Sequence, residues 1–264
     1  MQQSLITLLS DFGLRDEYVG VMKGAIAQIG PSLRVIDITH HIPPQNIAAG
    51  RFCLMNAYRY FPKGTVHVAV VDPGVGGKRR AIAVEIAEGF FVAPDNGLLS
   101  GVINQSGIYK AVELTNPKYW RTTVRSQISN TFHGRDIFAP VGAHLASGVP
   151  LKQLGEEIDP ASLIQLELPK CSSTKNGFLG CIQYIDYFGN SVTNIPGNYL
   201  EGKSWSISVA EKVIKGFDTY TDVMVGEAIS LVGSHGWVEI AVNSGNAQLQ
   251  LQIELGDSVE IFIE

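Results

Sequence analysis

Cysteine is scarce in this chain, and long hydrophobic runs are missing. The three cysteines, Cys53, Cys171 and Cys181, are an odd and widely spaced set, which excludes a disulfide framework and a C-x-x-C metal motif. No apolar run approaches the length of a membrane span, and residues 1–4 lack the basic region that opens a secretory signal. We therefore expect free thiols, no association with membranes and a cytoplasmic location.

Charge of either sign is also sparse. Charged residues make up 17% of the chain and hydrophobic residues 45%, a balance typical of a folded globular protein and not of a disordered one. The net charge of −5 is spread along the sequence, which argues against nucleic acid as a partner. The length of 264 residues suits one large domain or two smaller ones.

The first part of the chain alternates short apolar runs with segments of helical periodicity. This β-α-β rhythm predicts a mostly parallel sheet. Asp16 is placed to cap the first helix, whose apolar positions end at residue 29. The other expected elements are strands at residues 6–10, 35–38, 66–71, 81–86 and 90–92 and helices at residues 47–61 and 136–145.

The character of the sequence changes near Pro150. An irregular stretch over residues 151–176 precedes short strand-like runs that glycine and asparagine interrupt. These runs, at residues 178–185, 205–209, 229–232, 237–242 and 259–263, predict a small β-domain, either a barrel or a sandwich.

Two aspartates directly follow apolar strands of the first part. Ligands of open α/β sheets bind outside the carboxyl ends of strands, so Asp11 and Asp72 are candidate site residues, although either could merely cap a turn. Asp72 also opens a glycine-rich loop that ends in Arg79 and Arg80. This loop lacks the Gly-Lys-Ser/Thr ending of a phosphate loop, and a plain turn is the simpler interpretation.

His133 stands just before an expected helix. By itself it is compatible with an ordinary structural histidine. Together with Asp11, Asp72 and Asp136 it could form a metal-hydrolase cluster, but no ligand spacing supports one, and we predict no metal. The second part offers a carboxylate, an aromatic face and an amide close together, in Asp186, Phe188 and Asn190. This set suits a nucleoside, although an ordinary turn explains it too. Ser234 lies in a similar polar loop.

Taken together and in order, these motifs closely resemble the S-adenosylmethionine hydroxide adenosyltransferases, relatives of the fluorinase and chlorinase. The resemblance implies a Rossmann-like α/β domain over residues 1–165, a β-barrel-like domain over residues 166–264, and a homotrimer with active sites between subunits. The matching stretches, which span the chain, are LSDFG at 9–13, IPP at 42–44, VDPGVG at 71–76, APDNG at 93–97, TFHGRD at 131–136 and FGN at 188–190.

The resemblance also assigns roles to matching residues. Asp11 would bind the ribose hydroxyls, and the attacking water would be held by Asp72, Arg79 and His133. The remaining contacts would be to adenine, from Phe188, Asn190 and Tyr220, and to the methionine part, from Asp186 and Ser234.

The implied activity is hydrolysis of S-adenosylmethionine to adenosine and methionine without a cofactor. The halogenating relatives have tyrosine in place of Asp72 and Tyr-Ser in place of His133-Gly134, which argues against a 5′-halogenase. A protein that only binds or senses S-adenosylmethionine or adenosine is the other alternative. Such a protein would keep Asp11, Phe188 and Asn190 but would not need the water-binding set.

Overall fold

The computed structural model describes residues 5–121 and 128–264, so residues 1–4, which bear on the secretory signal, lie outside the described part. The chain divides into two compact units, Met1–Leu166 and Glu167–Glu264. Among the described residues, no helix is long and apolar enough to cross a membrane. The first unit is mixed α/β, and the second is a nearly closed β-barrel, which confirms the predicted fold class.

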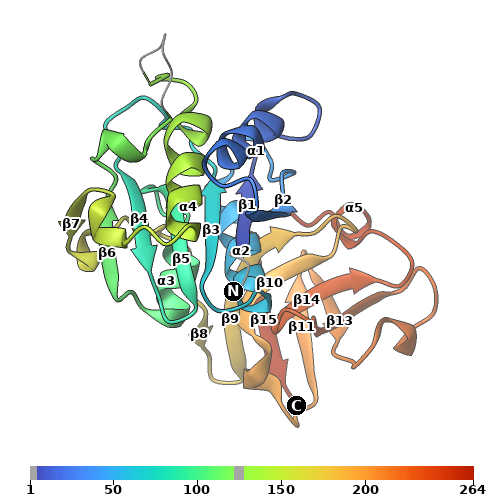
Figure 1. Cartoon of the computed structure of the whole chain (residues 1–264). Coiled ribbons are helices and arrows are strands. Elements are labelled where there is room, and N and C mark those ends of the chain that lie inside the picture. Colours follow the sequence, from blue (N-terminus) through green and yellow to red (C-terminus); the bar gives the residue numbers. More distant parts are fainter. Residues whose placement is uncertain (1–4, 122–127) are drawn as a thin grey trace. The chain divides into compact units, whose positions relative to one another are not determined.

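The sheet of the first unit has the strand order β2-β1-β3-β5-β4-β6-β7. The strands are β1 (Leu5–Ser10), β2 (Arg34–Thr39), β3 (Thr65–Val70), β4 (Ala81–Glu85), β5 (Gly89–Pro94), β6 (Lys110–Glu113) and β7 (Glu156–Ile158). The pairs β1–β2, β1–β3 and β3–β5 are parallel, and β1 lies beside β3 (Figure 1).

The prediction of a mostly parallel sheet is wrong for the other half of this sheet. The pairs β4–β5, β4–β6 and β6–β7 are antiparallel. Only residues 86–88 connect β4 to β5, and the Ile86 N–H donates to the Gly89 carbonyl oxygen across that turn. A parallel pair needs a crossover of roughly a dozen residues, so this short connection can form only a hairpin.

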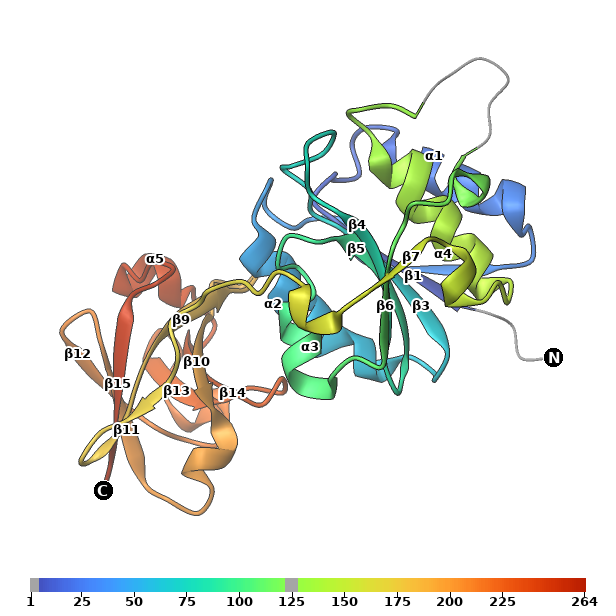
Figure 2. The same cartoon turned by 90° about the vertical axis from the view of Figure 1, so that its left-hand side faces the viewer.

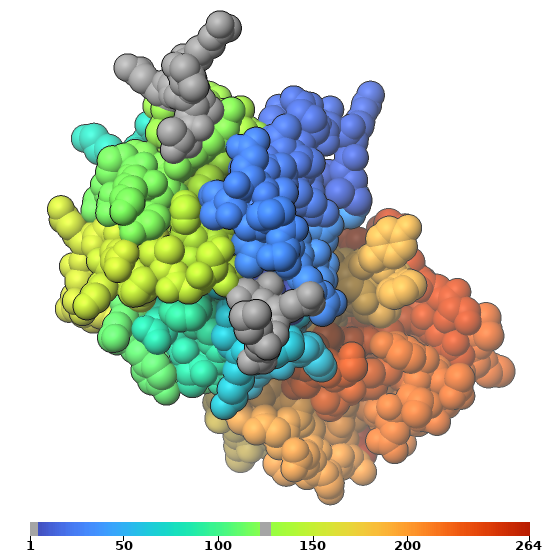
Figure 3. Space-filling view, in the orientation of Figure 1, coloured from blue at the N-terminus to red at the C-terminus, as the bar shows by residue number. Residues whose placement is uncertain are grey.

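Helices cover both faces of the sheet. Figure 2 shows α1 (Tyr18–Ile29) and α4 (Ala139–Ala146) on one face and α2 (Ile47–Ala57) and α3 (Ser100–Ser106) on the other. The pair α1 and α4 is also seen in Figure 3, blue beside yellow-green. Apolar side chains of β1, β3 and α4 are buried between the layers as the core of this unit.

Three helix predictions need correction at their ends. The first helix begins at Tyr18 and its N-terminus has no side-chain cap, so Asp16 does not cap it. The helix expected over residues 47–61 ends at Ala57 and is followed by a 3₁₀ turn, Tyr58–Tyr60. The third begins as a π-helical turn, Gly134–Phe138, that runs into α4. Tertiary packing overrides local propensity at such ends.

The second unit is an antiparallel sheet with the order β12-β11-β15-β9-β10-β14-β13. A parallel bridge between Gly216 and Ser230 brings its two edges together, which nearly closes the barrel. Its elements are β8 (Ser172–Ser173), β9 (Gly177–Ile185), β10 (Ser191–Pro196), β11 (Trp205–Val209), β12 (Lys212–Lys215), β13 (Ala228–Val232), β14 (Trp237–Val242), α5 (Ala247–Leu251) and β15 (Ser258–Ile263). Inward-facing side chains of these strands form a separate core.

Candidate active site

Asp11 and Asp72 follow two adjacent parallel strands. Ser10 at the end of β1 is in register with Val70 at the end of β3, and each aspartate comes just beyond that edge. Parallel strands place their carboxyl ends on one edge of the sheet, so both carboxylates belong to the edge where α/β folds bind ligands.

The guanidinium of Arg79 lies between a carboxylate and an imidazole. Its Nε atom is 3.0 Å from Oδ1 of Asp72, and its Nη2 atom is 2.7 Å from Nδ1 of His133. The side chains of Arg79 and Asp72 are only 10% and 5% exposed. The structure thus brings together the three residues to which the family resemblance assigns the water, in a poorly hydrated place where charge-assisted hydrogen bonds are strong.

The environment of His133 favours its neutral form. Burial and the Arg79 cation lower the pKa of His133 below its ordinary value, although Asp72 and Asp136 oppose that shift. A guanidinium has only donors, so Nδ1 of His133 must accept, and we assign the hydrogen of the neutral ring to Nε2. His133 therefore has one N–H to offer a small polar ligand, and Asp72 has acceptor capacity.

A glycine lets the loop that carries Asp72 and Arg79 reach the loop that carries His133. Gly76 has a positive φ of 74°, and a Cβ there would lie 2.2 Å from the carbonyl oxygen of Asn130. Any other residue would force the loops apart. The sequence signal for this contact was the run of glycines after Asp72.

Asp136 holds the loop before His133 in place. Its buried carboxylate accepts from Arg135 Nε at 2.6 Å, from the Ser129 N–H at 2.9 Å and from Arg121 Nη1 at 3.1 Å. Burial alone would raise the pKa of Asp136, but these hydrogen bonds lower it below its ordinary value. Asp136 therefore anchors this loop, and the charges of Arg135 and Arg121 balance the negative charge of its carboxylate.

An aromatic cluster that the sequence analysis missed joins the loop after Asp11 to the loop before His133. The ring of Phe12 lies 5.7 Å from that of Phe132, and Tyr18 lies 5.2 Å from Phe132. Phe12 and Phe132 each stand next to a motif residue, Asp11 and His133, which was the signal available, whereas Tyr18 had none.

The neighbouring Arg80 serves a different cluster. Its Nε donates to Oδ2 of Asp95 at 2.9 Å, and its Nη2 donates to the carbonyl oxygen of Ser162 at 2.7 Å. Of the two adjacent arginines, Arg79 therefore belongs to the cluster with Asp72 and His133.

Asp11 has one carboxylate oxygen occupied by the backbone. The Gln45 N–H donates to Oδ2 at 2.8 Å, and Gln45 has a positive φ of 65°, which is uncommon for this residue type. Among the residues that the structure describes, Oδ1 has no hydrogen-bond partner. Asp11 therefore has an oxygen ready for a ligand hydroxyl.

In the second unit, Asp186 organises the turn between β9 and β10. Its Oδ1 accepts from the N–H groups of Phe188 and Asn190, both at 2.9 Å, and its Oδ2 accepts from Asn190 Nδ2 at 3.0 Å. Phe188 is 70% exposed although Asn190 is buried. The turn thus presents the aromatic face of Phe188 beside the fixed amide of Asn190. These residues can therefore form an ordinary turn and still bind a nucleoside.

Tyr220 is fixed through its hydroxyl. It donates to Oε1 of buried Glu239, whose other oxygen lies 3.0 Å from Nε2 of His235. Burial, Glu239 and Asp186 raise the pKa of Tyr220, so the phenol is neutral. Sequence reasoning missed Glu239, although a single acid inside the apolar strand β14 was a signal. Ser234 is exposed in the loop between β13 and β14.

Two further observations bear on other ligands. No group of three His, Cys, Asp or Glu side chains within residues 5–121 and 128–264 is placed to hold a metal ion.

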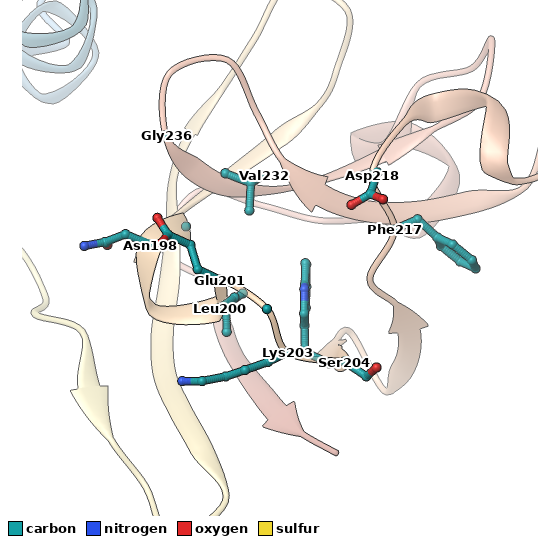
Figure 4. Close-up of a pocket in the computed structure, with 12 residues that line it drawn as sticks. Asn198, Leu200, Glu201, Lys203, Ser204, Phe217, Asp218, Val232 and Gly236 are labelled. Atoms are coloured by element: carbon teal, nitrogen blue, oxygen red, sulfur yellow. The ribbon is translucent and has the colours of Figure 1, made fainter.

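A hollow of about 730 Å³ lies in the second unit, with Asn198 and Glu201 on one side and Asp218 on the other (Figure 4). None of the predicted site residues lines it.

Comparison with known proteins identifies the family. Residues 6–155 match the N-terminal domain of the SAM hydroxide adenosyltransferases, and residues 180–260 match their C-terminal domain. The chain belongs to this family.

Individual members are similar over nearly the whole length. An "(R)-S-adenosyl-L-methionine hydrolase" of Salinispora tropica is 40% identical, with 97% of each chain covered. A fluorinase of an Actinoplanes species is 28% identical, again with 97% of each covered. A crystal structure of an uncharacterized conserved protein from Thermotoga maritima, 38% identical, superposes with a TM-score of 0.89 over 97% of this chain and 99% of that one. The resemblance inferred from the motifs is confirmed.

Proposed function

We propose that this protein hydrolyses S-adenosyl-L-methionine to adenosine and L-methionine by attack of water on C5′. The observation that carries the proposal is the Asp72–Arg79–His133 cluster at the ligand-binding edge of the first unit. Membership of the hydroxide adenosyltransferases, with a 40% identical relative named as a hydrolase of this substrate, supports it.

The cluster suits the activation of water. The leaving group is a neutral thioether, so neither a general acid nor a metal is needed for its departure. The Arg79 cation lowers the cost of developing hydroxide character, Asp72 accepts a proton or hydrogen bond from the water, and Nε2–H of His133 donates to its oxygen. Alignment of oxygen, C5′ and sulfur supplies further rate enhancement.

The remaining predicted residues would hold the substrate. Asp11 grips the ribose hydroxyls through its unpaired oxygen. In the second unit, Phe188 stacks on adenine and Asn190 reads its edge, with Tyr220 as a second ring. Asp186 and Ser234 bind the ammonium and carboxylate of the methionine part.

Assembly, location and stereochemistry complete the proposal. The family resemblance implies a homotrimer with active sites between subunits, and we propose that assembly here. The name of the Salinispora relative specifies the (R) sulfonium epimer, and we propose the same preference here. No cofactor is required, and we retain the expectation of a cytoplasmic location.

The test is incubation of the purified protein with each sulfonium epimer, followed by chromatography for adenosine and methionine. We expect equimolar products, faster from the (R) epimer and unaffected by exhaustive chelation. A protein that binds the substrate without releasing either product is a sensor and not a hydrolase. Light scattering should give the mass of a trimer, and full activity of a monomer at high dilution would contradict the assembly.

A further inference from the structure

A chain of polar contacts runs beneath Asp11, through residues outside the Asp72–Arg79–His133 cluster. The Oγ atom of Ser10 lies 2.7 Å from Nδ1 of His40, and Nε2 of His40 lies 3.2 Å from Oδ1 of Asp37. Ser10 and His40 are 0% and 2% exposed, whereas Asp37 reaches the surface and pairs with Lys23 at 2.7 Å. Serine, histidine and aspartate thus form a relay from the surface to the base of the candidate ribose site.

The protons of this relay can be assigned. The Phe12 N–H donates to the Ser10 Oγ at 3.3 Å, so the Ser10 hydroxyl hydrogen is free to donate to Nδ1 of His40. The hydrogen of the neutral ring then belongs on Nε2, which faces the Asp37 carboxylate at ion-pair distance but off the line of a good hydrogen bond. Nδ1 of His40 is thus hydrogen-bonded to Ser10, whereas Nε2 has only the electrostatic attraction of the Asp37 carboxylate.

The electrostatic surroundings of His40 favour this neutral form. Burial lowers the pKa of His40 below its ordinary value, and Lys23 and His41 add to that shift, although Asp37 opposes it. The ring therefore acts near neutral pH as a fixed hydrogen-bonding spacer.

The relay holds the backbone on either side of Asp11. Ser10 precedes Asp11, and the Phe12 N–H that follows it is bound to the Ser10 Oγ. The Gly13 N–H donates to the His40 carbonyl oxygen at 2.7 Å, so His40 fixes this loop by its main chain as well. With the Asp11 carboxylate also held by the Gln45 N–H at 2.8 Å, Asp11 has little freedom to turn.

A catalytic Ser-His-Asp triad does not explain the arrangement. A nucleophilic serine needs a route to its substrate and an oxyanion site beside it. The Ser10 side chain is fully buried, and its oxygen already accepts from the Phe12 N–H.

We propose that Ser10, His40 and Asp37 are positioning residues that preset the Asp11 carboxylate for a vicinal diol, the 2′,3′-hydroxyls of a nucleoside. This rests on the proposed role of Asp11 in binding ribose. A carboxylate fixed before binding loses little freedom when it accepts two hydroxyls, so the relay contributes to affinity for the diol and not to affinity for the base.

The experiment compares adenosine with 2′,3′-dideoxyadenosine, which lacks the diol. Dissociation constants are measured by calorimetry for the wild type, Ser10→Ala and His40→Ala, with His41→Ala as the matched control because His41 is exposed and adjacent. We expect Ser10→Ala and His40→Ala to weaken adenosine binding by roughly tenfold and dideoxyadenosine binding by less than about twofold. His41→Ala should leave both unchanged.

Two outcomes would overturn the proposal: equal losses for both ligands, which indicate a merely structural role, or unchanged binding of adenosine. Ser10→Ala removes a single oxygen, and Asp37→Asn keeps the side-chain shape but removes the charge that faces His40 and Lys23, so these variants remain informative if His40→Ala does not fold. Asp11→Ala tests the role of Asp11 in binding ribose separately from hydrolysis. If it leaves the preference for adenosine intact, the assignment of Asp11 to ribose fails, whereas hydrolysis itself is tested by product formation.

Discussion

Nη2 of Arg79 lies 2.7 Å from Nδ1 of His133, although 54 residues separate them in the sequence. Because the guanidinium also pairs with Asp72, the cation is shared between an anion and a neutral ring. Removing either partner changes the electrostatic balance of the cluster, which makes the cluster the most informative target for substitution.

Asp72→Asn and His133→Ala should abolish most turnover and leave affinity for adenosine within a few fold. Each change removes an interaction with the water that strengthens in the transition state, which lowers kcat by about a hundredfold or more. Product formation gives kcat and calorimetry gives the adenosine affinity, with His41→Ala as a control. Wild-type turnover in either folded variant would refute the role assigned to that residue.

Gly76→Ala should reduce turnover because its Cβ would push against Asn130 and separate His133 from Arg79. Gly64→Ala is the matched control, since Gly64 also has a positive φ, 84°, but has open space around it. Both changes introduce backbone strain of about 1 kcal/mol, and only Gly76→Ala should impair kcat. Equal activity of the two variants in the same assay would rule out the loop contact as the cause.

Phe188→Ala should weaken adenosine binding by about 1–3 kcal/mol, the scale of stacking a base on an aromatic ring. The neighbouring Tyr187, 97% exposed, supplies the control variant Tyr187→Ala. Calorimetric titration distinguishes them, and a comparable loss in Tyr187→Ala would mean that the binding ring has been misassigned.

The nucleophile should be water and never a halide. In the proposed site the Asp72 carboxylate would face the incoming nucleophile and repel a halide, and Gly134 offers no side-chain hydroxyl to replace the hydration of the halide. In oxygen-18 water with added fluoride or chloride, mass spectrometry should find the label in the 5′-hydroxyl of adenosine. Unlabelled adenosine, or a 5′-halo-5′-deoxyadenosine, would contradict this mechanism.

Stability should depend on pH through His67, which is buried in the core and bound to Thr7 at 2.7 Å. Burial lowers the pKa of His67 from 6.5 to about 4. As the solution is acidified, His67 is therefore protonated in the unfolded chain at a higher pH than in the folded chain. Its contribution to stability is complete above pH 6.5 and is lost progressively toward pH 4.

Between pH 7.5 and 5, the wild type should therefore lose roughly 2 kcal/mol more unfolding free energy than His67→Phe. Urea denaturation at the two pH values measures the difference. His41→Phe, at an exposed site, should retain the wild-type pH dependence. Parallel pH profiles for wild type and His67→Phe would show that His67 titrates normally.

Local sequence was sufficient for the elements that matter most to the site. Apolar runs that end in aspartate predicted β1 and β3 and placed Asp11 and Asp72 at their ends. A buried strand can be recognised locally because it appears in the sequence as a short, continuous run of apolar residues. The order of the motifs predicted the family, and the comparisons confirmed it.

What the tertiary structure decided were relationships between distant residues. The adjacent Arg79 and Arg80 are chemically identical, and although the motif favoured Arg79, only the fold shows that their partners are Asp72 and Asp95. The pairing of His40 with Ser10 has no periodic signal either. Hydrophobic burial brings such segments together, and the polar groups buried with them must then find partners that no local pattern of residues specifies.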